Sequence, residues 1–591
     1  MSENDLDDVT PGAESFEQPE WFDEAAYLLA NPDVLESVAA GEFPSAYHHY
    51  VLHGRKERRP LFGNSAERRN CLVRSKPISD DPIAQVDIRC SIEVLMISPR
   101  GAILIVGWID DLASPLELIR LRASGWHITL TASRLARFRR SDVEQSLHAG
   151  YGHSFGFFAF VYAGEALGSS ACSVSLRLSD GTEYCRDVNV RVVSEIEIRD
   201  TVLSYVSTCE VYGNRQVEAA RMLCGPLGDA IINHNKDISK ELVAGAYVET
   251  FGPRKRKRIG SLVVCLYGKP EYLFLQSALF SGNPGFEDYE MIYVSNSPEM
   301  AEQLVKDMRI AQIVYEIPQT LVLLPGNAGF GAANNLAVQS ASTNRVLIVN
   351  PDIFPRDHDW ARKHTEVVAT MQKSQTQLFG VPLYYDDGSL MHGGMYFDFD
   401  SGLSVDKTAM TSRRMVRVEH YGKGTPAWLE TYTKPRPVPA VTGAFMSIDR
   451  GWFERLGGFT EDYVFGHYED ADLCLKSIAS GVAPWIHDVR LWHLEGKGSA
   501  RSSVHDGGSH LNRGIFSERW GSTISAGLEG PKPTHPLLDP HSRASRAESR
   551  LGVRDGTSTS QAKTSVNDTL DDAPRPRPAV ASVDKPELNE R

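Results

Sequence analysis

The sequence contains one carboxylate in a setting that suits ligand binding. Asp352 belongs to Asn350-Pro351-Asp352, which directly follows the apolar run 346–349. The apolar run is typical of a strand buried on both faces, and the residues after it are typical of the turn that ends such a strand. Ligands bind at the carboxyl ends of strands in open α/β sheets, so Asp352 is a candidate ligand-binding residue. The same tripeptide at 31–33 lies between two helical patterns, where it indicates a plain turn.

A second acidic stretch and a lone histidine also carry reactive groups. Glu469, Asp470 and Asp472 lie within four residues, directly before an apolar run. A carboxylate here can accept a proton as a general base, but carboxylates also stabilise the first turn of a helix. Both interpretations stay open from the residues alone, and we expect Asp472 to begin and cap a helix. His493 lies in the apolar stretch 491–494, a setting in which a histidine is usually part of the core.

The elements that must position these residues lie within 261–521, where strand and helix patterns alternate as in one α/β domain. A Gly-rich turn at 326–335 opens a helix, where backbone N–H groups and the helix dipole favour an anion. The turn matches neither a Walker loop nor the dinucleotide GxGxxG pattern. We predict buried strands at 261–266, 289–294, 321–324 and 346–349.

Length and composition exclude several classes of protein. The 591 residues predict roughly four domains. A hydrophobic content of 42% and a charged content of 23% are typical of a globular chain, and a net charge of −14 argues against a general nucleic-acid binder. No apolar run approaches the roughly 20 residues that span a bilayer. The acidic N-terminus does not resemble a secretory signal, and eight scattered cysteines without a CxxC pair predict a reduced, cytoplasmic protein.

The rest of the chain divides by composition and periodicity. We predict a disordered segment at 1–18, a small helical module at 19–62, an all-β sandwich-like domain at 85–195, a helical linker region at 196–258 and a disordered tail at 526–591. A polar linker joins the helical module to the β domain.

Three clusters outside the α/β domain have both a chemical and a plain interpretation. Histidines in the helical module could bind a metal, arginines in the β domain could bind an anionic glycan or lipid headgroup, and a basic run could contact a membrane or nucleic acid. We favour packing for the histidines, a solvated face for the arginines and an interdomain linker for the basic run. The clusters are His48, His49 and His53; Arg137, Arg139 and Arg140; and 254–258.

Motifs in the α/β domain carry a family resemblance. After the first strand come VSNS (294–297), NAGFGAANN (327–335) and VNPDI (349–353). The downstream half continues with GVPLYYDDGSLMHGG, VTGAFMSIDRGWFERLGGFTEDYVFGHYEDADLCLKSIASG, VRLWHLEGKGS and NRGIFSERWG. This order resembles an inverting family-2 glycosyltransferase of the rhamnosyltransferase-like branch, which implies a GT-A, Rossmann-like catalytic domain over 259–525. The helical module carries FDEAAYLLANPDV (22–34) and YHHYVLHGRKERRP (47–60), and it resembles a module attached to bacterial surface and glycan-assembly proteins.

The resemblance implies a reaction and roles for the reactive residues. Glycosyl transfer expels a nucleoside diphosphate, and a divalent cation, Mn²⁺ or Mg²⁺, stabilises its charge. Asp352 and His493 match the metal ligands, and Asp470 matches the general base. Glu469, Gly457 and Gly458 match acceptor-binding positions. The implied donor-binding residues are Leu266, Tyr267, Ser295, Asn296, Asn327, Gly329, Phe330, Asn334 and Asn350.

Two positions depart from the family pattern. The Asp that recognises the pyrimidine ring after the second strand is replaced by Ser295, beside Asn296. A neutral side chain can still hydrogen-bond the base, but more weakly. Asn350 replaces the first Asp of the metal motif, as in many members of the branch, and leaves Asp352 as the only carboxylate of its triplet.

The resemblance also implies partners and a location. We expect a UDP- or dTDP-sugar donor, a glycan or lipid-linked glycan acceptor of surface polysaccharide biosynthesis, and no nucleic acid. The protein would be cytoplasmic, with peripheral association at the inner membrane or with an assembly complex as a further expectation. Two alternatives remain. A nucleotidyltransferase would lack the Glu-Asp and late His motifs, and a non-catalytic scaffold would use the accessory domains for docking.

Overall fold

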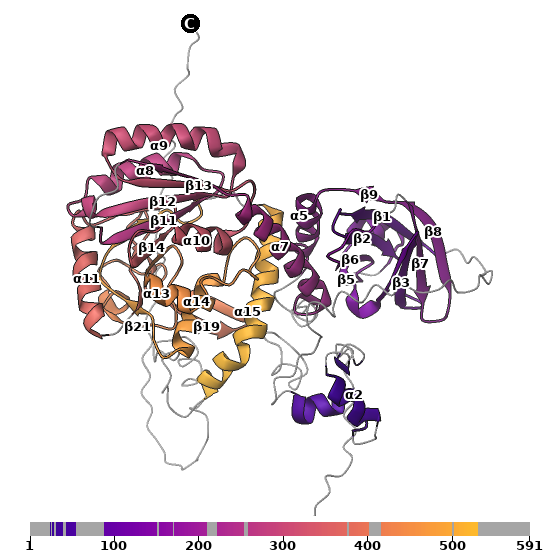
Figure 1. Ribbon diagram of the computed structural model, residues 1–591. Coiled ribbons are helices and arrows are strands. Elements are labelled where there is room, and N and C mark those ends of the chain that lie inside the picture. The colour runs from indigo at the N-terminus through magenta and orange to yellow at the C-terminus, as the bar shows by residue number, and fades with distance from the viewer. Residues whose placement is uncertain are drawn as a thin grey trace, which may run out of the picture. The chain divides into compact units, whose positions relative to one another are not determined.

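The computed structural model describes most of the chain between residues 88 and 529 (Figure 1). The ranges are 88–149, 153–168, 171–209, 222–252, 258–374, 377–400, 415–498 and 502–529, with further residues between 24 and 54. The predicted segment 1–18, the polar linker and the tail beyond 529 lie outside the described residues. The predicted tail begins too early, because 526–529 belong to helix α15 (Ser503–Glu529).

The N-terminal module contains α2 (Pro32–Ala39), α3 (Ala46–His49) and a π-helical turn, η1 (Tyr50–Gly54). Tyr27, Val34 and Ala46 form its buried core. The His49 ring packs among aromatic side chains, and its Nδ1 lies 3.1 Å from the Tyr27 hydroxyl. Within the described ranges, no three His, Cys, Asp or Glu side chains are grouped as a metal site would require.

Two packed sheets follow. The five-stranded sheet has the order β5-β6-β2-β1-β9 and the four-stranded sheet has the order β4-β3-β7-β8. Each arginine of the predicted basic cluster pairs with a carboxylate: Arg137 with Asp111, Arg139 with Glu144, and Arg140 with Glu93 and Asp142. The strands are β1 (Cys90–Ile97), β2 (Ala102–Ile109), β3 (Leu116–Ala123), β4 (Trp126–Thr131), β5 (Ala136–Phe138), β6 (Gly156–Tyr162), β7 (Ala171–Leu178), β8 (Glu183–Asn189) and β9 (Arg191–Val192), with α4 at Ser141–Ser146.

The segment predicted as a helical linker contains two helices and a strand. Helices α5 (Glu195–Val206) and α7 (Pro226–Ala244) agree with the helical spacing. The helical prediction is wrong for β10 (Tyr247–Phe251), which pairs antiparallel with β13 as the edge of the large sheet. The sequence Tyr-Val-Glu-Thr-Phe is rich in aromatic and β-branched residues, which fit a pleated edge strand.

A nine-stranded mixed sheet organises the α/β region, in the order β10-β13-β12-β11-β14-β22-β16-β23-β21. The four central strands, β13, β12, β11 and β14, run parallel, so the strand order reverses between β11 and β14. The strands are β11 (Gly260–Leu266), β12 (Tyr289–Ser295), β13 (Gln319–Leu323), β14 (Arg345–Val349), β16 (Leu378–Gly380), β21 (Arg436–Pro437), β22 (Phe445–Asp449) and β23 (Trp485–Ile486).

Helices and two smaller sheets complete this region. One small sheet has the order β15-β24-β17-β18, and the other pairs β19 (Met395–Phe399) with β20 (Val416–His420). The remaining elements are β15 (Ile353–Pro355), β17 (Leu383–Tyr384), β18 (Leu390–His392), β24 (Leu491–His493), α8 (Glu271–Ser281), α9 (Ala301–Tyr315), α10 (Phe330–Gln339), α11 (Trp360–Ser374), α13 (Arg450–Arg455) and α14 (Glu469–Ala479).

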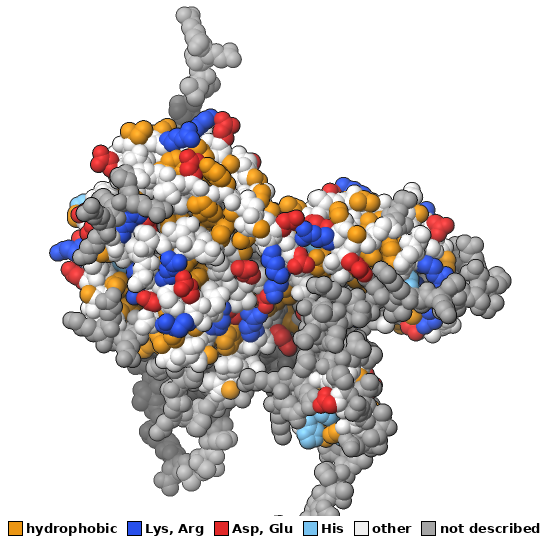
Figure 2. Space-filling view, viewed as in Figure 1, with side chains coloured by type: hydrophobic (Ala, Val, Ile, Leu, Met, Phe, Trp, Pro, Cys, Tyr) orange, Lys and Arg blue, Asp and Glu red, His pale blue; other side chains and the backbone are white. Residues whose placement is uncertain are grey.

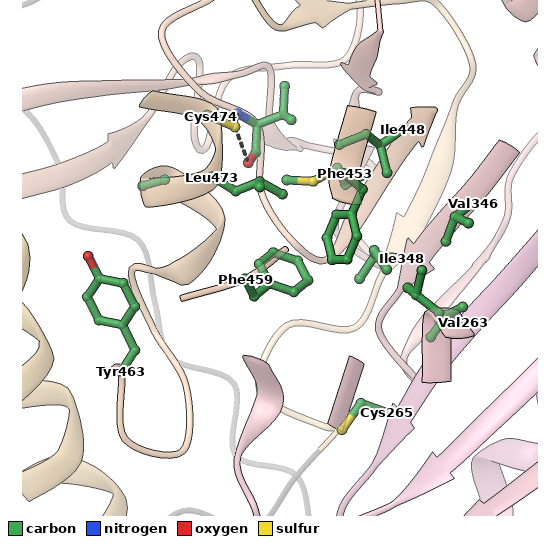
Figure 3. Close-up of a cluster of buried hydrophobic side chains, with 14 of the residues drawn as sticks. Val263, Cys265, Val346, Ile348, Ile448, Phe453, Phe459, Tyr463, Leu473 and Cys474 are labelled. Carbon is green, nitrogen blue, oxygen red and sulfur yellow. Dashed lines mark hydrogen bonds between the residues drawn. The ribbon is translucent and has the colours of Figure 1, made fainter. Parts of the chain in front are cut away.

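The core under the catalytic candidates joins α13 and α14 to the large sheet (Figure 3). Val263 and Ile348 from the central strands face Phe453, Phe459 and Leu473. All five side chains are buried, so the start of α14 is fixed relative to the central strands.

Two features relate to the expected partners: the distribution of charge on the surface and the length and polarity of the helices. On the face shown in Figure 2, acidic and basic side chains are interspersed over the large sheet region. No helix in the described part of the chain is both long enough and apolar enough to cross a bilayer.

Candidate active site

The structure brings Asp352 and His493 together. Ile353, the first residue of β15, pairs with His493, the last residue of β24. Asp352 Oδ1 lies 3.4 Å from His493 Nε2, although the residues are far apart in sequence, and both side chains are almost fully buried. The backbone N–H of Leu494 donates to Asp352 O, which fixes the two chain segments at this point.

The geometry of this pair suits a small divalent cation. Neighbouring ligands of an octahedral Mg²⁺ at 2.0–2.1 Å lie about 3 Å apart, close to the observed separation. A Cβ on Gly498 would lie 3.0 Å from the Asp352 carboxylate and would crowd it, and the Gly498 N–H donates to Asp352 Oδ2 over 3.0 Å. His493 Nδ1 is buried and has no hydrogen-bond partner among the described residues. Two protein ligands leave most of the coordination shell for substrate oxygens and water.

Residues after β11 and β12 border the point where the strand order reverses. Tyr267 follows β11, and its ring lies 5.1 Å from the His505 ring, between centroids. Leu266 is fully buried and accepts the Asn296 N–H through its carbonyl. Ser295 is 1% exposed and bonds to Ser297, so its hydroxyl is engaged within its own turn.

Asn296 connects the β12 turn to the Gly-rich turn. Its Oδ1 accepts the Ala328 N–H at 3.1 Å, and its Nδ2 donates to Gly329 O at 3.3 Å. The side chain is 4% exposed. In this structure Asn296 therefore shapes the Gly-rich turn, whereas the sequence prediction places it against the nucleotide base.

Hydrogen bonds and close backbone packing fix the conformation of the Gly-rich turn. Asn327 Oδ1 accepts the Gly329 N–H at 2.9 Å. Gly329 has φ +89°, and a Cβ there would lie 3.2 Å from Phe465 backbone atoms. Phe330 begins α10 and its carbonyl accepts from Asn334 Nδ2, which is fully buried. The turn thus places the N-terminus of α10 at the carboxyl edge of the sheet, where it can attract an anion.

Asp470 lies beside the same edge. Its Oδ2 accepts the Gly443 N–H at 2.7 Å, and its Oδ1 accepts the Ala471 N–H at 2.7 Å. The neighbouring Ala444 carbonyl accepts the Asn350 N–H, so the turn after β14 and the start of α14 are joined through two residues. Burial raises the pKa of Asp470, while the two backbone donors favour its charged form.

Glu469 precedes Asp470 and is 6% exposed. Burial, and then the charge of Asp470, raises the pKa of Glu469 to about 8. Its Oε2 has no hydrogen-bond partner among the described residues. Burial therefore disfavours two negative charges on this pair, and the raised pKa of Glu469 favours its neutral form.

Asp472 has a different role from its neighbours. Helix α14 begins at Glu469, and its N-cap position is occupied by Tyr468 without a side-chain capping bond. The prediction that Asp472 begins and caps the helix is wrong, because its carboxylate turns inward to distant donors. These are Thr460 Oγ1 at 2.6 Å, Trp520 Nε1 at 2.8 Å, Tyr463 OH at 3.1 Å and Arg519 Nη1 at 3.2 Å.

Gly457 and Gly458 end α13. Their N–H groups donate to Glu454 O and Phe453 O, and both have positive φ, as in a glycine C-cap. A Cβ on Gly458 would lie 2.6 Å from Asn335 Oδ1 on α10. Gly458 thus lets α13 pack closely against α10, whereas a Cβ on Gly457 would meet no atom within 4 Å and Gly457 serves the turn through its positive φ.

Sequence reasoning missed the segment that leads into the acidic pair. Phe465, His467 and Tyr468 have φ of 61°, 82° and 77°, in the left-handed region. Asn512 and Arg199 contact the same part of the chain. Asn512 belongs to one of the family-like motifs, but no local pattern marks its role, since its partners lie more than 40 residues away.

Comparisons with known proteins do not assign this chain to a family. No family model matches the chain. It is 26% identical over 266 residues to the uncharacterized protein y4gI of Sinorhizobium fredii, which covers 44% of this chain and 26% of that relative. The chain thus matches about a quarter of the relative's length.

Similar solved structures include three proteins of low sequence identity to this chain. They are GalNAc-T7 with UDP, GalNAc and Mn²⁺ (13% identity, 50% of this chain, 55% of that chain, TM-score 0.32), S. aureus TarS 1–349 (12%, 46%, 75%, 0.27) and the mannosyltransferase PcManGT from Pyrobaculum calidifontis with GDP-Man and Mn²⁺ (12%, 59%, 91%, 0.28). TM-scores below 0.5 do not establish a shared fold.

Proposed function

We propose that this chain is a metal-dependent, inverting glycosyltransferase. It would transfer a hexosyl or deoxyhexosyl group from a UDP- or dTDP-sugar to a hydroxyl of a bacterial surface glycan, such as O-antigen or capsule, in the cytoplasm. The observation that supports this best is the meeting of Asp352 and His493 at 3.4 Å, beside the end of β14. The Gly-rich turn and the Asp470 carboxylate border the same edge of the sheet.

Asp470 is the proposed general base. It takes the proton of the acceptor hydroxyl while that oxygen bonds to the anomeric carbon and the bond to the diphosphate breaks. Gly443 and Ala471 hold the carboxylate in place through their N–H groups, so it can act without reorganisation. Attack from the face opposite the leaving group inverts the configuration.

Glu469 is the proposed acceptor-orienting residue. Burial raises its pKa to about 8, and its protonated form can donate a hydrogen bond to an acceptor oxygen. Its Oε2 is buried without a partner among the described residues, and a hydrogen bond to the acceptor would satisfy it.

Asp352 and His493 are the proposed protein ligands of Mn²⁺ or Mg²⁺. When bound, the cation supplies Lewis-acid stabilisation of the diphosphate leaving group. Gly498 orients Asp352 through its N–H, and the N-terminus of α10 adds a partial positive charge toward the phosphates. Tyr267, Asn327 and Asn350 follow β11, β13 and β14, and they are the proposed donor-side residues of this site.

Donor turnover tests the proposal. Purified protein with Mn²⁺ is incubated with a panel of UDP- and dTDP-sugars, and free nucleotide is measured with and without glycan acceptors. Turnover should occur with one donor and fall at least about 100-fold in Asp470→Asn. Glu302→Gln, which removes a carboxylate that is 84% exposed on α9, should keep wild-type turnover.

The alternatives give different results in the same assay. Release of pyrophosphate from a nucleoside triphosphate and a sugar phosphate would favour a nucleotidyltransferase. Binding of nucleotide-sugars without turnover, unchanged in Asp470→Asn, would favour a non-catalytic scaffold and would refute the proposal.

A further inference from the structure

The segment 464–468 leads directly into Glu469 and Asp470 in a conformation that needs outside support. Three of its residues, Phe465, His467 and Tyr468, have φ between 61° and 82°. Non-glycine residues rarely adopt this region, and such conformations persist only when surrounding contacts impose them. The contacts that impose this one come from elements remote in sequence.

Asn512 on α15 supplies most of those contacts. Its Oδ1 accepts the Val464 N–H at 2.7 Å. Its Nδ2 donates to Gly466 O at 2.6 Å and to Val464 O at 2.9 Å, and lies 3.4 Å from His467 O. The side chain is fully buried, so water does not replace these bonds. One amide therefore satisfies the backbone on both sides of Phe465.

Arg199 on α5 holds the other side of the same segment. Its guanidinium lies 4.6 Å from the Phe465 ring centroid, and its Nη1 donates to Asn327 O at 3.2 Å. The side chain is 2% exposed. The Phe330 N–H donates to Phe465 O at 2.5 Å. Arg199 thus connects the strained segment to the Gly-rich turn on the donor side.

Helix α15 can make these contacts because two glycines let it approach closely. A Cβ on Gly507 would lie 1.9 Å from Leu203 O on α5, and a Cβ on Gly508 would lie 3.1 Å from Val464 O. Larger residues would move α15 away from α5 or from the strained segment. The position of Asn512 is therefore set by the packing of these two helices.

We propose that Asn512 and Arg199 are positioning residues of the active site. Asn512 holds the segment that aims Glu469 and Asp470, and Arg199 holds the Gly-rich turn against the same segment. The inference rests on the proposed function for its kinetic consequences. Its conformational consequences do not depend on that function.

The kinetic test uses the full chain and the isosteric variant Asn512→Asp. This change keeps an oxygen for the Val464 N–H but replaces the Nδ2 donor with an oxygen that faces backbone carbonyls. A displacement near 1 Å costs up to about 100-fold in rate, so kcat should fall by about tenfold to 100-fold while the KM for the donor stays within about threefold. Arg199→Lys should instead raise the donor KM, because lysine cannot both stack on the Phe465 ring and donate to Asn327 O as the guanidinium does.

The conformational test measures hydrogen exchange of the 464–470 amides by mass spectrometry. Asn512→Asp should accelerate exchange there and leave the β11 and β14 amides protected as in the wild type. Asn283→Asp is the matched control, since it alters a buried amide whose Nδ2 donates to Leu279 O, outside the strained segment. This control should change neither kcat nor exchange at 464–470.

The outcomes separate the inference from the proposed function. Wild-type exchange at 464–470 in Asn512→Asp, or a loss of kcat that only follows a loss of folded protein, would overturn the inference. If the wild type transfers no sugar but exchange at 464–470 rises selectively in Asn512→Asp, the positioning role stands and the glycosyltransferase proposal fails.

Discussion

Replacing Asp472 with Asn should destabilise the protein strongly, whereas the same change at Asp470 should not. Asp472 is fully buried and accepts bonds from four side chains, among them the Arg519 guanidinium. Lys476 Nζ lies 3.5 Å from the same carboxylate. These contacts tie α14 to the loop before it and to α15, so we assign Asp472 to the stability of the fold rather than to substrate binding.

The size of the expected destabilisation follows from the loss of one acceptor oxygen and of the negative charge when the carboxylate becomes an amide. The Asp472→Asn variant keeps one acceptor oxygen but turns an NH₂ group toward side chains that are themselves donors. Breaking a buried ion pair from one side costs about 3–5 kcal/mol. At about 2–4 °C per kcal/mol for a domain of this size, Tm should fall by about 6–20 °C.

Thermal unfolding followed by circular dichroism measures this difference. Asp470→Asn is the matched control, because it removes the same charge two residues earlier on the same helix. Its Tm should fall by less than that of Asp472→Asn, since Asp470 accepts two backbone N–H groups but no bond from a charged side chain. Equal Tm values for Asp472→Asn and the wild type, or a larger loss in Asp470→Asn, would refute the separation of structural and catalytic carboxylates.

Three further predictions concern the site. Because the folded-state pKa of Glu469 lies above its ordinary value of 4.5, the stability that this group contributes should be fully present below pH 4.5 and decline toward pH 8, and Glu469→Gln should flatten that decline in urea titrations. Asp352→Asn and His493→Ala should each weaken Mn²⁺ binding at least about tenfold by calorimetry, with unchanged Tm in chelator; equal affinities would remove both as ligands. Gly498→Ala should weaken Mn²⁺ binding as well, because the new Cβ meets the Asp352 carboxylate at 3.0 Å, and wild-type affinity would contradict this.

The sequence predicts the strand ends well because their signals are local. The apolar run before Asn350 and the proline after it mark the end of β14 without knowledge of any partner. Local signals do not predict the pairing of Ile353 with His493. Only the order of the family-like motifs indicates that Asp352 and His493 lie together.

The rest depends on contacts between distant parts of the chain. Asp472 looks like a helix-capping carboxylate until Trp520 and Arg519 are placed beside it. Residues 247–251 follow a long helix, and their membership of the large sheet is decided by pairing with β13. Asn512 has no pattern of its own, since its function is set by the backbone that it meets.

The pairing of β10 with β13 changes where the α/β region can be cut from the rest of the chain. A fragment that starts at residue 259, at the boundary predicted from the sequence, would expose the unpaired edge of β13 and lack Arg199. Unpaired edges invite association with other strands, so such a fragment should aggregate. A fragment starting ahead of α5, near residue 194, keeps both, but it uncovers the apolar faces of α5 and α7 that pack against β2 and β6.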